Sequence, residues 1–323
     1  MEAHAHHATP PEAHVHVVQD VMVGGGGTYA TQGGRYVYAE PAYPGYVHEY
    51  LKQDISPETW RHGGWRLTRR VPRAFAVLHS NLMWGHWLLE VFPKLFAIRA
   101  LNARGVHAPI LISSNAPSYV PGIIQDVLPG QEVIAYNPAR RQVNVGRLIL
   151  PPMLQRFYVF HPAFGEAIDA YAAGARRAGT PERVFVSRGG MRTDWAYREL
   201  ENEPELEAVA AEMGFAVVRP ETLPWREQLA LFSGARVVAG EFGSGIHNTL
   251  FSPAGTKVVA LNCIGDTQSR IANFRRQDIG YVLADDGQPR VFHGGAQLQR
   301  FRVDPGAFRS ALTTAVAAAE ESA

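Results

Sequence analysis

Cysteine, net charge and long apolar runs are all scarce in this sequence. Cys263 is the only cysteine, which excludes an internal disulfide and allows a reducing compartment. The 31 basic and 30 acidic side chains leave a net charge of +1, which excludes strong attraction to nucleic acid or anionic membrane as the organising theme. No apolar run approaches the roughly 20 residues of a membrane helix, and the N-terminus lacks the pattern of a signal peptide. We therefore expect a soluble, cytoplasmic protein.

The first 70 residues look unlike the rest of the chain. Five histidines stand among alanines and prolines at the start: His4, His6, His7, His14 and His16. Closely spaced histidines can bind metal, but a poorly structured leader explains them more simply. The glycine- and tyrosine-rich stretch up to residue 46 predicts irregular β hairpins. Residues 1–70 are thus expected to form a leader followed by an irregular β segment.

From Val71 onward, short apolar runs alternate with segments of helical period. The runs that predict strands lie at residues 73–80, 109–113, 132–136, 147–151, 183–188, 215–220, 236–243, 257–262 and 280–285. Helices are expected at residues 85–105, 203–213, 224–234, 246–252 and 305–322. This alternation predicts an α/β protein with parallel sheets covered by helices on both faces.

The length of 323 residues and the two series of strands predict two Rossmann-like halves. The pattern is interrupted near residues 152–162, so we expect domains at residues 71–158 and 159–300, followed by a C-terminal helix at 301–323. Folds of this kind bind ligands at the carboxyl ends of their strands, between the halves.

A turn with closely spaced glycines follows one strand pattern in "VVAGEFGSGIHNTLF", residues 237–251. Glycine adopts positive φ and lets another group approach the backbone. Because a helix is expected to begin near Gly245, its unpaired amides would attract a phosphate beside His247 and Asn248. A tight turn with Ser244 as a capping residue explains the same pattern without a ligand. Both interpretations stay open at this point.

A second cluster lies on the first long helix. His86 and Glu90 are four residues apart and are expected to share one face. A carboxylate beside a histidine suits a general base, although a solvated polar face is the simpler alternative. Pro93 lacks a backbone N–H and clashes with the preceding turn, so we expect a kink there.

A third cluster follows the strand pattern at residues 183–188. Arg188 ends this pattern, and an arginine facing a cleft suits phosphate through its planar fork of donors. Arg192 comes soon after it. Asn202 and Glu203 open the next helix, where helix capping alone would also explain them.

Taken in order, these segments resemble glycosyltransferase family 61, which includes bacterial capsular polysaccharide biosynthesis proteins. The matching stretches are "NLMWGHWLLEVFPKL", "VFVSRGGMR", "NEPEL" and "GFAVVRPETLPWREQLALFSGARVVAGEFGSGIHNTLF", and they span roughly residues 80–262. The resemblance depends on the ordered combination of these motifs. The first 70 or so residues have no clear counterpart in the family.

The resemblance implies a GT-B fold, with two Rossmann-like domains facing a central cleft, the acceptor side first and the nucleotide-sugar side second. It implies inverting transfer from a nucleotide sugar to a hydroxyl of a glycan or lipid-linked saccharide, with no cofactor required. The surface or capsular polysaccharide pathway that it suggests would place the protein in the cytoplasm, with peripheral association at the inner face of the membrane.

The resemblance also assigns site residues. Those of the donor pattern are Arg188, Arg192, Asn202, Glu203, Gln228, Gly243, Ser244, Gly245 and Asn248, the last four forming a diphosphate loop. His86 and Glu90 match the histidine and acidic positions of the first-domain motif. The chain departs from the family at Phe242, where many members have histidine. Either His247 replaces that histidine from one turn away, or the donor differs.

The mechanism expected from these residues is a displacement without a metal ion. Glu90 or His86 is the expected base, and Glu241 is a rival because it adjoins the phosphate turn. A non-catalytic protein that binds sugar nucleotides or polysaccharide on the same fold is the alternative of a different class. A Rossmann epimerase would require a dinucleotide fingerprint near its first strand, which this sequence lacks.

Overall fold

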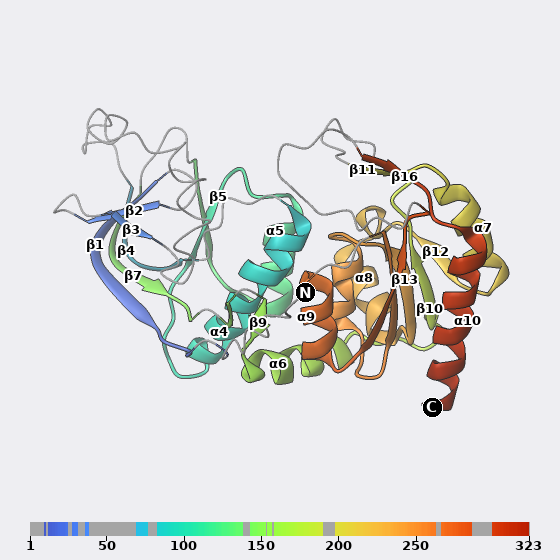
Figure 1. Cartoon of the computed structure of the whole chain (residues 1–323). Helices are drawn as coiled ribbons and strands as arrows, with labels where there is room; N and C mark the ends of the chain where they lie inside the picture. The colour runs from blue at the N-terminus through green and yellow to red at the C-terminus, as the bar shows by residue number, and fades with distance from the viewer. Residues whose placement is uncertain are drawn as a thin grey trace, which may run out of the picture. The chain divides into compact units, whose positions relative to one another are not determined.

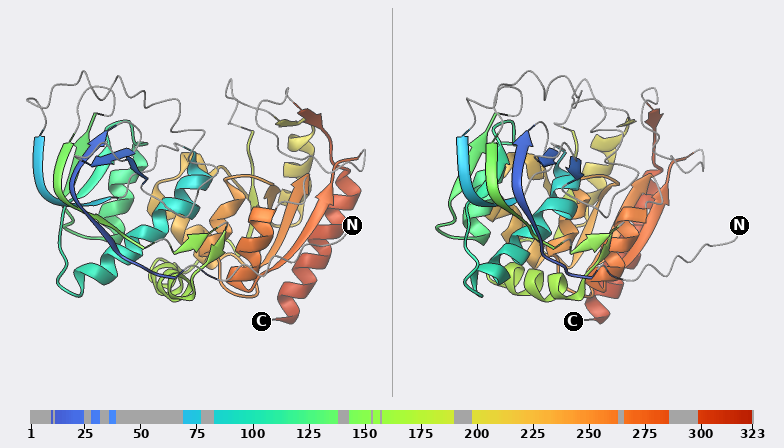
Figure 2. Two further views of the ribbon diagram at one scale, coloured as in Figure 1. Left: turned by 60° about the vertical axis from the view of Figure 1, so that its left-hand side comes forward. Right: turned by 90° about the vertical axis from the view of Figure 1, so that its left-hand side faces the viewer.

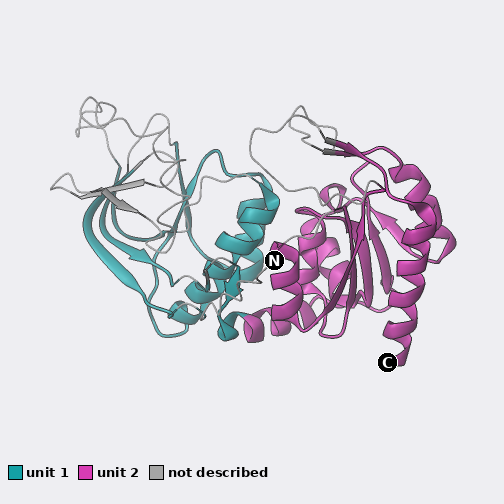
Figure 3. Ribbon diagram, viewed as in Figure 1, with its two compact units in different colours: residues 1–164 teal, residues 165–323 magenta. Residues whose placement is uncertain are grey.

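The protein consists of two compact units, residues 1–164 and 165–323 (Figure 3). A computed structural model describes residues 10, 12–24, 28–31, 36–38, 69–76, 83–137, 143–152, 154–156, 158–189, 198–262, 266–285 and 299–322. Several residues singled out in the sequence therefore lie outside the described part: His4, His6, His7, Arg192 and Cys263.

Unit 1 is built around a seven-stranded sheet of order β3-β2-β1-β7-β4-β5-β6. Its strands are β1 (His16–Gly24), β2 (Thr28–Thr31), β3 (Tyr36–Tyr38), β4 (Arg69–Ala76), β5 (Ile110–Ser113), β6 (Val133–Tyr136) and β7 (Val143–Leu150), with the short pair β8 (Gln155–Arg156) and β9 (Val159–Phe160) outside the sheet. The described helices of this unit are α3 (Trp84–His86), the π-helical turn η2 (Trp87–Val91), α4 (Phe92–Asn102) and α5 (Tyr119–Val127), and α6 (Pro162–Ala173) crosses into unit 2.

The first sheet is mixed, which corrects the expectation of a purely parallel sheet. Strands β4, β5, β6 and β7 are parallel, whereas β1 runs antiparallel to β7, and β2 and β3 continue from it antiparallel. The links between β1, β2 and β3 are short, and a parallel connection requires a crossover of a dozen or more residues. Within the parallel part, the chain runs from β4 outward to β6 and then returns to β7 on the other side of β4. The order of strands therefore reverses between β4 and β7.

Unit 2 contains a five-stranded parallel sheet of order β12-β10-β13-β14-β15. Its strands are β10 (Arg183–Val186), β12 (Ala216–Val218), β13 (Val237–Glu241), β14 (Lys257–Asn262) and β15 (Asp278–Leu283), with β11 (Arg198–Leu200) and β16 (Gln299–Phe301) forming a separate parallel pair. Its helices are α7 (Glu203–Glu212), η3 (Pro220–Thr222), α8 (Trp225–Gly234), η4 (Ile246–Phe251), α9 (Asp266–Arg275) and α10 (Pro305–Glu321).

Helices cover both faces of this second sheet (Figure 1). One hydrophobic core joins the sheet to α7 and to α10, which runs alongside the strands in each view (Figures 1 and 2). Phe185 of β10 and Phe308 of α10 are fully buried in this core, with ring centroids 5.7 Å apart. Helices α8 and α9 contact η4 on the opposite side. Because both faces are covered, the strands read as almost continuous apolar runs.

Within the described ranges, the expected strands and helices after residue 71 are confirmed to within a few residues, except that η4 is a 3-10 helix. Residues 77–80 of the strand expected at 73–80 lie outside the described part. Helices α5, α6 and α9 were not expected, and neither was β1. Of the helices in the described ranges, none combines the length and the apolar character that crossing a bilayer requires.

Gly240 is needed in β13 because neighbouring atoms fill the space of a side chain. A Cβ atom at this position would lie 2.8 Å from the carbonyl oxygen of Val186 and 2.9 Å from its Cβ. We expect Gly240→Ala to lower the free energy of unfolding by about 1–3 kcal/mol, because β10 and β13 must separate. Gly280→Ala in β15 is the matched control, since nothing lies within 4 Å of its added Cβ. Equal urea midpoints for the two variants would contradict this explanation.

Candidate functional site

The strand order of unit 2 identifies where a ligand site is expected. From β10 the chain first moves outward to β12, and then returns to β13 on the other side of β10. In open α/β sheets, ligands bind outside the carboxyl ends of the strands at such a switch point. The residues at the carboxyl ends of β10 and β13 include Ser187, Arg188 and Glu241, followed by the glycine turn. The limits of β10 and β13 and their pairing thus place Arg188 and the glycine turn at the same edge of the sheet.

Arg188 reaches from the end of β10 to the end of β13. Its Nη1 donates to Oε1 of Glu241 over 3.2 Å, and its backbone N–H donates to Oε1 of Glu203 over 2.6 Å. The Glu241 side chain is 3% exposed, and the Arg188 side chain is 23% exposed. The guanidinium is therefore anchored on its buried side and keeps a face toward solvent.

Two further carboxylates surround this pair. Ser187 Oγ donates to Oε1 of Glu207, and Gly189 N–H donates to Ser187 Oγ over 3.1 Å. Burial raises the pKa of the Glu203 carboxyl above its ordinary value, the Arg188 N–H lowers it, and the charges of Glu241 and Glu207 raise it. The carboxylates of Glu203, Glu207 and Glu241 thus concentrate negative charge around Arg188. Protonation of Glu203 would lower that negative charge.

The glycine turn joins β13 to η4. Gly243 has φ of 155°, which favours glycine, and a Cβ at Gly245 would lie 3.0 Å from Cγ1 of Val186. Gly245 is the N-cap residue of η4, and no described side chain hydrogen-bonds there as a cap. The prediction of a capping serine is therefore wrong at Ser244, because the turn closes through backbone bonds such as Ile246 N–H to Gly243 O at 3.1 Å.

His247 and Asn248 lie inside the protein, 7% and 1% exposed. Nδ1 of His247 is 2.8 Å from Oε1 of Gln268 on α9, and the imidazole packs edge-on against Phe242 with centroids 5.8 Å apart. Gln268 Nε2 in turn donates to Thr249 Oγ1 over 2.8 Å. These contacts fix η4 against α9 and hold the imidazole in one orientation.

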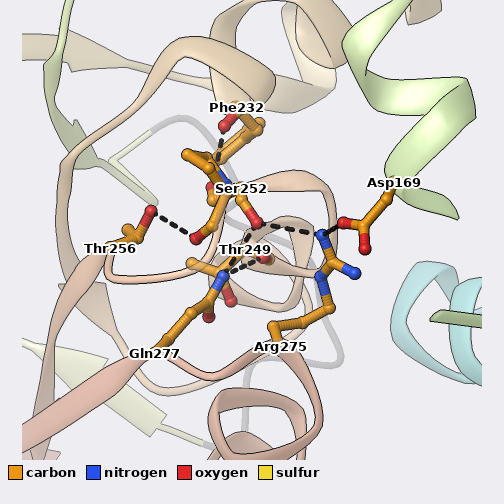
Figure 4. A network of polar contacts seen from close by, with 8 residues as sticks. Asp169, Phe232, Thr249, Ser252, Thr256, Arg275 and Gln277 are labelled. Atoms are coloured by element: carbon orange, nitrogen blue, oxygen red, sulfur yellow. Dashed lines mark hydrogen bonds and ion pairs between the residues drawn. The ribbon is translucent and has the colours of Figure 1, made fainter. Parts of the chain in front are cut away.

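A second polar network holds the far end of η4 (Figure 4). Gln277 Nε2 donates to the carbonyl oxygens of Thr249 and Ser252 at 2.8 and 3.1 Å, and Arg275 Nη2 donates to Ser252 O at 3.3 Å while pairing with Asp169. Ser252 Oγ donates to Phe232 O at 2.8 Å. The carbonyl groups at the end of a helix lack intrahelical partners, and these side chains supply them.

Asn202 and Gln228, two further residues of the donor pattern, have partners within unit 2. Asn202 is the N-cap residue of α7, but its side-chain amide hydrogen-bonds to the backbone of Val303. Its Nδ2 donates to the Val303 carbonyl oxygen over 2.9 Å, and its Oδ1 accepts from the Val303 N–H over 3.2 Å. No cap from its side chain is present among the described residues, so side-chain capping is a wrong prediction there. Gln228 Nε2 donates to Leu223 O over 2.9 Å.

In unit 1, His86 and Glu90 contact each other as the spacing predicts. Nδ1 of His86 lies 2.6 Å from Oε1 of Glu90, and the two side chains are 25% and 7% exposed. Both residues belong to the helical segment that follows β4, the strand at which the order of this sheet reverses. The candidate residues of each unit therefore follow a strand at the switch point of their own sheet.

The expected kink at Pro93 takes the form of a π-helical turn. The Phe92 N–H donates to the carbonyl of Trp87, five residues earlier, and Pro93 is the second residue of α4. In an α-helix, a proline ring clashes with the carbonyl group one turn before it. The wider π turn moves that carbonyl group, which explains why the π turn comes just before Pro93. Such turns frequently occur at functional sites, and this one contains Glu90.

Lys94 is a buried lysine on the same helix, and burial lowers the pKa of its ammonium from 10.5 to about 7. Between these two values the unfolded chain binds a proton that the folded chain has released, so the free energy of unfolding rises with pH. We expect Lys94→Met to be more stable than the wild type at pH 7. Its advantage should shrink by up to ~1.4 kcal/mol per pH unit toward pH 10.

Urea unfolding at pH 7, 8.5 and 10 measures this difference. Lys257→Met is the control, because the Lys257 ammonium pairs over 2.5 Å with the exposed carboxylate of Asp278. The difference between this control and the wild type should stay nearly constant over the same range. Parallel stability curves for Lys94→Met and the wild type would show that the buried amine is not neutral at high pH in the folded state.

Four residues near these sites were not predicted from the sequence: Lys94, Glu207, Arg219 and Asn262. Glu207 is four residues after Glu203 on α7, and Arg219 follows β12 as Arg188 follows β10, so both had a spacing signal. Asn262 ends β14 with φ of 83°, fully buried. Its Oδ1 and Nδ2 have no hydrogen-bond partner in the described ranges, and no local sequence signal reveals this.

Comparison with known proteins supports a family assignment. The model of glycosyltransferase family 61 matches residues 84–259, which is 176 of the 323 residues and a little over half of the chain. The match begins just before the His86 and Glu90 pair and extends through the glycine turn into β14. No curated protein matches the chain. Because the family model matches more than half of the chain, the chain belongs to glycosyltransferase family 61.

Proposed function

We propose that the protein is an inverting glycosyltransferase, which moves a hexosyl or pentosyl group from a nucleotide sugar to a hydroxyl acceptor. The observation that carries the proposal is the switch point of unit 2, where Arg188 and the glycine turn at Gly243 follow neighbouring strands. Family membership supports transfer of a sugar. We further propose that the two units are the halves of a GT-B fold, with the donor bound to unit 2 and the acceptor to unit 1.

The leaving nucleoside diphosphate is proposed to bind at the edge of unit 2. The exposed face of Arg188 and the backbone amides from Gly243 to Gly245 would donate to its oxygens, with Arg192, His247 and Asn248 nearby in the sequence. Asn202, Glu203 and Gln228 would shape this edge through the bonds that they make to Val303, Arg188 and Leu223. In this arrangement Glu241 anchors Arg188 and is not the base.

His86 is proposed as the base, with Glu90 as the residue that positions it. Glu90 is the more buried of the two, and its carboxylate accepts from Nδ1 of the imidazole. A proton held on Nδ1 leaves the lone pair on Nε2, which is the arrangement that a general base requires. The sequence alone left either residue as the base, and the difference in exposure favours His86.

The reaction is then one displacement. Nε2 of His86 takes the proton of the acceptor hydroxyl as its oxygen forms a bond to the anomeric carbon. The bond between that carbon and the diphosphate oxygen breaks on the opposite face, and its electrons leave with the nucleoside diphosphate. Guanidinium and amide donors, without a metal ion, offset the charge that develops on the leaving group. Synthesis of bacterial surface or capsular polysaccharide at the inner face of the membrane is the proposed setting.

The test is release of nucleoside diphosphate from a panel of nucleotide sugars, with and without saccharide acceptors. We expect release with at least one donor and an acceptor-linked product of inverted configuration. Binding of a donor without turnover across many acceptors would instead support a non-catalytic protein that binds sugar nucleotides. If no nucleotide sugar binds at all, the proposal fails.

A further inference from the structure

Arg219 is a second arginine at the carboxyl edge of the same sheet. It directly follows β12, which pairs in parallel with β10, and Ser187 N–H donates to Val218 O over 2.8 Å. Arg188 and Arg219 therefore leave neighbouring strands, which lie about 4.8 Å apart in a sheet. Strand β12 is on the far side of β10 from β13. Because Val186 pairs with Val218, Arg219 starts beside Ser187, one residue before Arg188.

The two arginines lean in the same direction along this edge. Arg219 Nε donates to Ser187 Oγ at the end of β10 over 3.4 Å, just as Arg188 reaches Glu241 at the end of β13. Gly189 leaves room for this, because a Cβ there would lie 3.2 Å from Nη2 of Arg219. The fold therefore directs the guanidinium of Arg219 over the loop that carries Arg188.

Among the described residues, few take up the donors of the Arg219 guanidinium. Its nearest carboxylate contact is Nη2 to Oε1 of Glu207 at 3.7 Å, which is too long for a hydrogen bond. Within the described part of the chain, the hydrogen bond from Nε is the only one that the guanidinium makes. The side chain is 46% exposed. A partly exposed guanidinium fork of this kind matches the oxygens of a phosphate.

We propose that Arg219 binds the second phosphate of the donor, while Arg188 binds the first, so that the site selects nucleoside diphosphate sugars over nucleoside monophosphate sugars. A monophosphate carries one anionic group and would leave one guanidinium without a partner. This inference rests on the proposed function, since it assumes a nucleotide at the edge of unit 2.

The test compares dissociation constants for UDP and UMP, GDP and GMP, and CDP and CMP by calorimetry. The wild type should bind at least one diphosphate more tightly than its monophosphate. Arg219→Gln should weaken diphosphate binding about tenfold, the value expected for one charge-assisted hydrogen bond, and change monophosphate binding less than about twofold. Arg219→Lys keeps the charge without the fork and should lie between the two.

Arg302→Gln is the matched control. Arg302 is 49% exposed and pairs with Glu205 of α7 over 3.2 Å. Like Arg219→Gln, this variant therefore removes a half-exposed guanidinium that lies beside a glutamate of α7. It should bind both nucleotides as the wild type does, with a similar thermal midpoint to Arg219→Gln. If Arg219→Gln lost the same affinity for the monophosphate and the diphosphate, or lost none for either, the role of Arg219 would be overturned and the proposed function would stand. If the wild type binds none of the six nucleotides, the proposed function fails and this inference with it.

Discussion

Arg188→Ala is expected to lower kcat for sugar transfer by roughly 10²–10³-fold. Among the described residues, only the guanidinium of Arg188 connects the ends of β10 and β13, where the diphosphate is proposed to leave. Loss of one such donor to a developing charge typically has an effect of this size. The substitution also leaves Glu241, 3% exposed, without this cationic partner, so the acidic cluster would repel the departing phosphates.

Steady-state kinetics with a saturating acceptor measure this effect. Arg188→Lys retains the charge but not the fork, and it should recover only part of the rate. Arg176→Ala removes an exposed arginine after α6 and serves as the control that should keep full activity. If Arg188→Ala turned over at the rate of this control, the leaving group would have to bind elsewhere.

His86→Ala is expected to lower kcat by roughly 10²–10⁴-fold, the usual contribution of a general base. Glu90→Gln should lower kcat less, because the imidazole remains but Nδ1 loses the carboxylate that orients it. Neither substitution should change the affinity for the nucleoside diphosphate, because both residues belong to unit 1. Glu132→Gln, on an exposed loop of that unit, is the control with unchanged turnover.

Rescue by added imidazole separates the two roles. The small base can enter the space that His86→Ala leaves, because the native side chain is 25% exposed, and it should restore part of the rate. It should not help Glu90→Gln, in which the imidazole ring is still present. The reverse pattern would assign the base to Glu90, and a full rate in both variants would remove the pair from the mechanism.

The sequence determined most of the fold because its signals are local. The strands of unit 2 are buried on both faces and therefore read as apolar runs, which is why the expected limits of β10, β13 and β14 agree with the structure. The pair of His86 and Glu90 was predictable because four residues make about one helical turn. The family was recognisable from the order of such segments.

Some features had no local signal. The antiparallel addition of β1 to β7 depends on pairing between residues more than a hundred positions apart, and spacing along the chain does not specify it. The sequence likewise predicted an α-helix after Gly245, whereas η4 is a 3-10 helix whose ends and side chains are held by Gln268, Arg275 and Gln277. Those partners come from α9 and the segment after it, and α9 itself was not expected.

The sequence by itself therefore determined which elements form and which residues end them, because propensity and periodicity act over a few residues. Only the tertiary structure decided which of those ends meet. The strand order β12-β10-β13 places Arg219, Arg188 and the glycine turn along one edge, although they stand far apart in the chain. Burial then distinguished the two members of each ion pair. His86 and Arg188 are partly exposed, whereas their partners Glu90 and Glu241 are buried. Burial and strand order are properties of the whole packed sheet, which no short stretch of sequence contains.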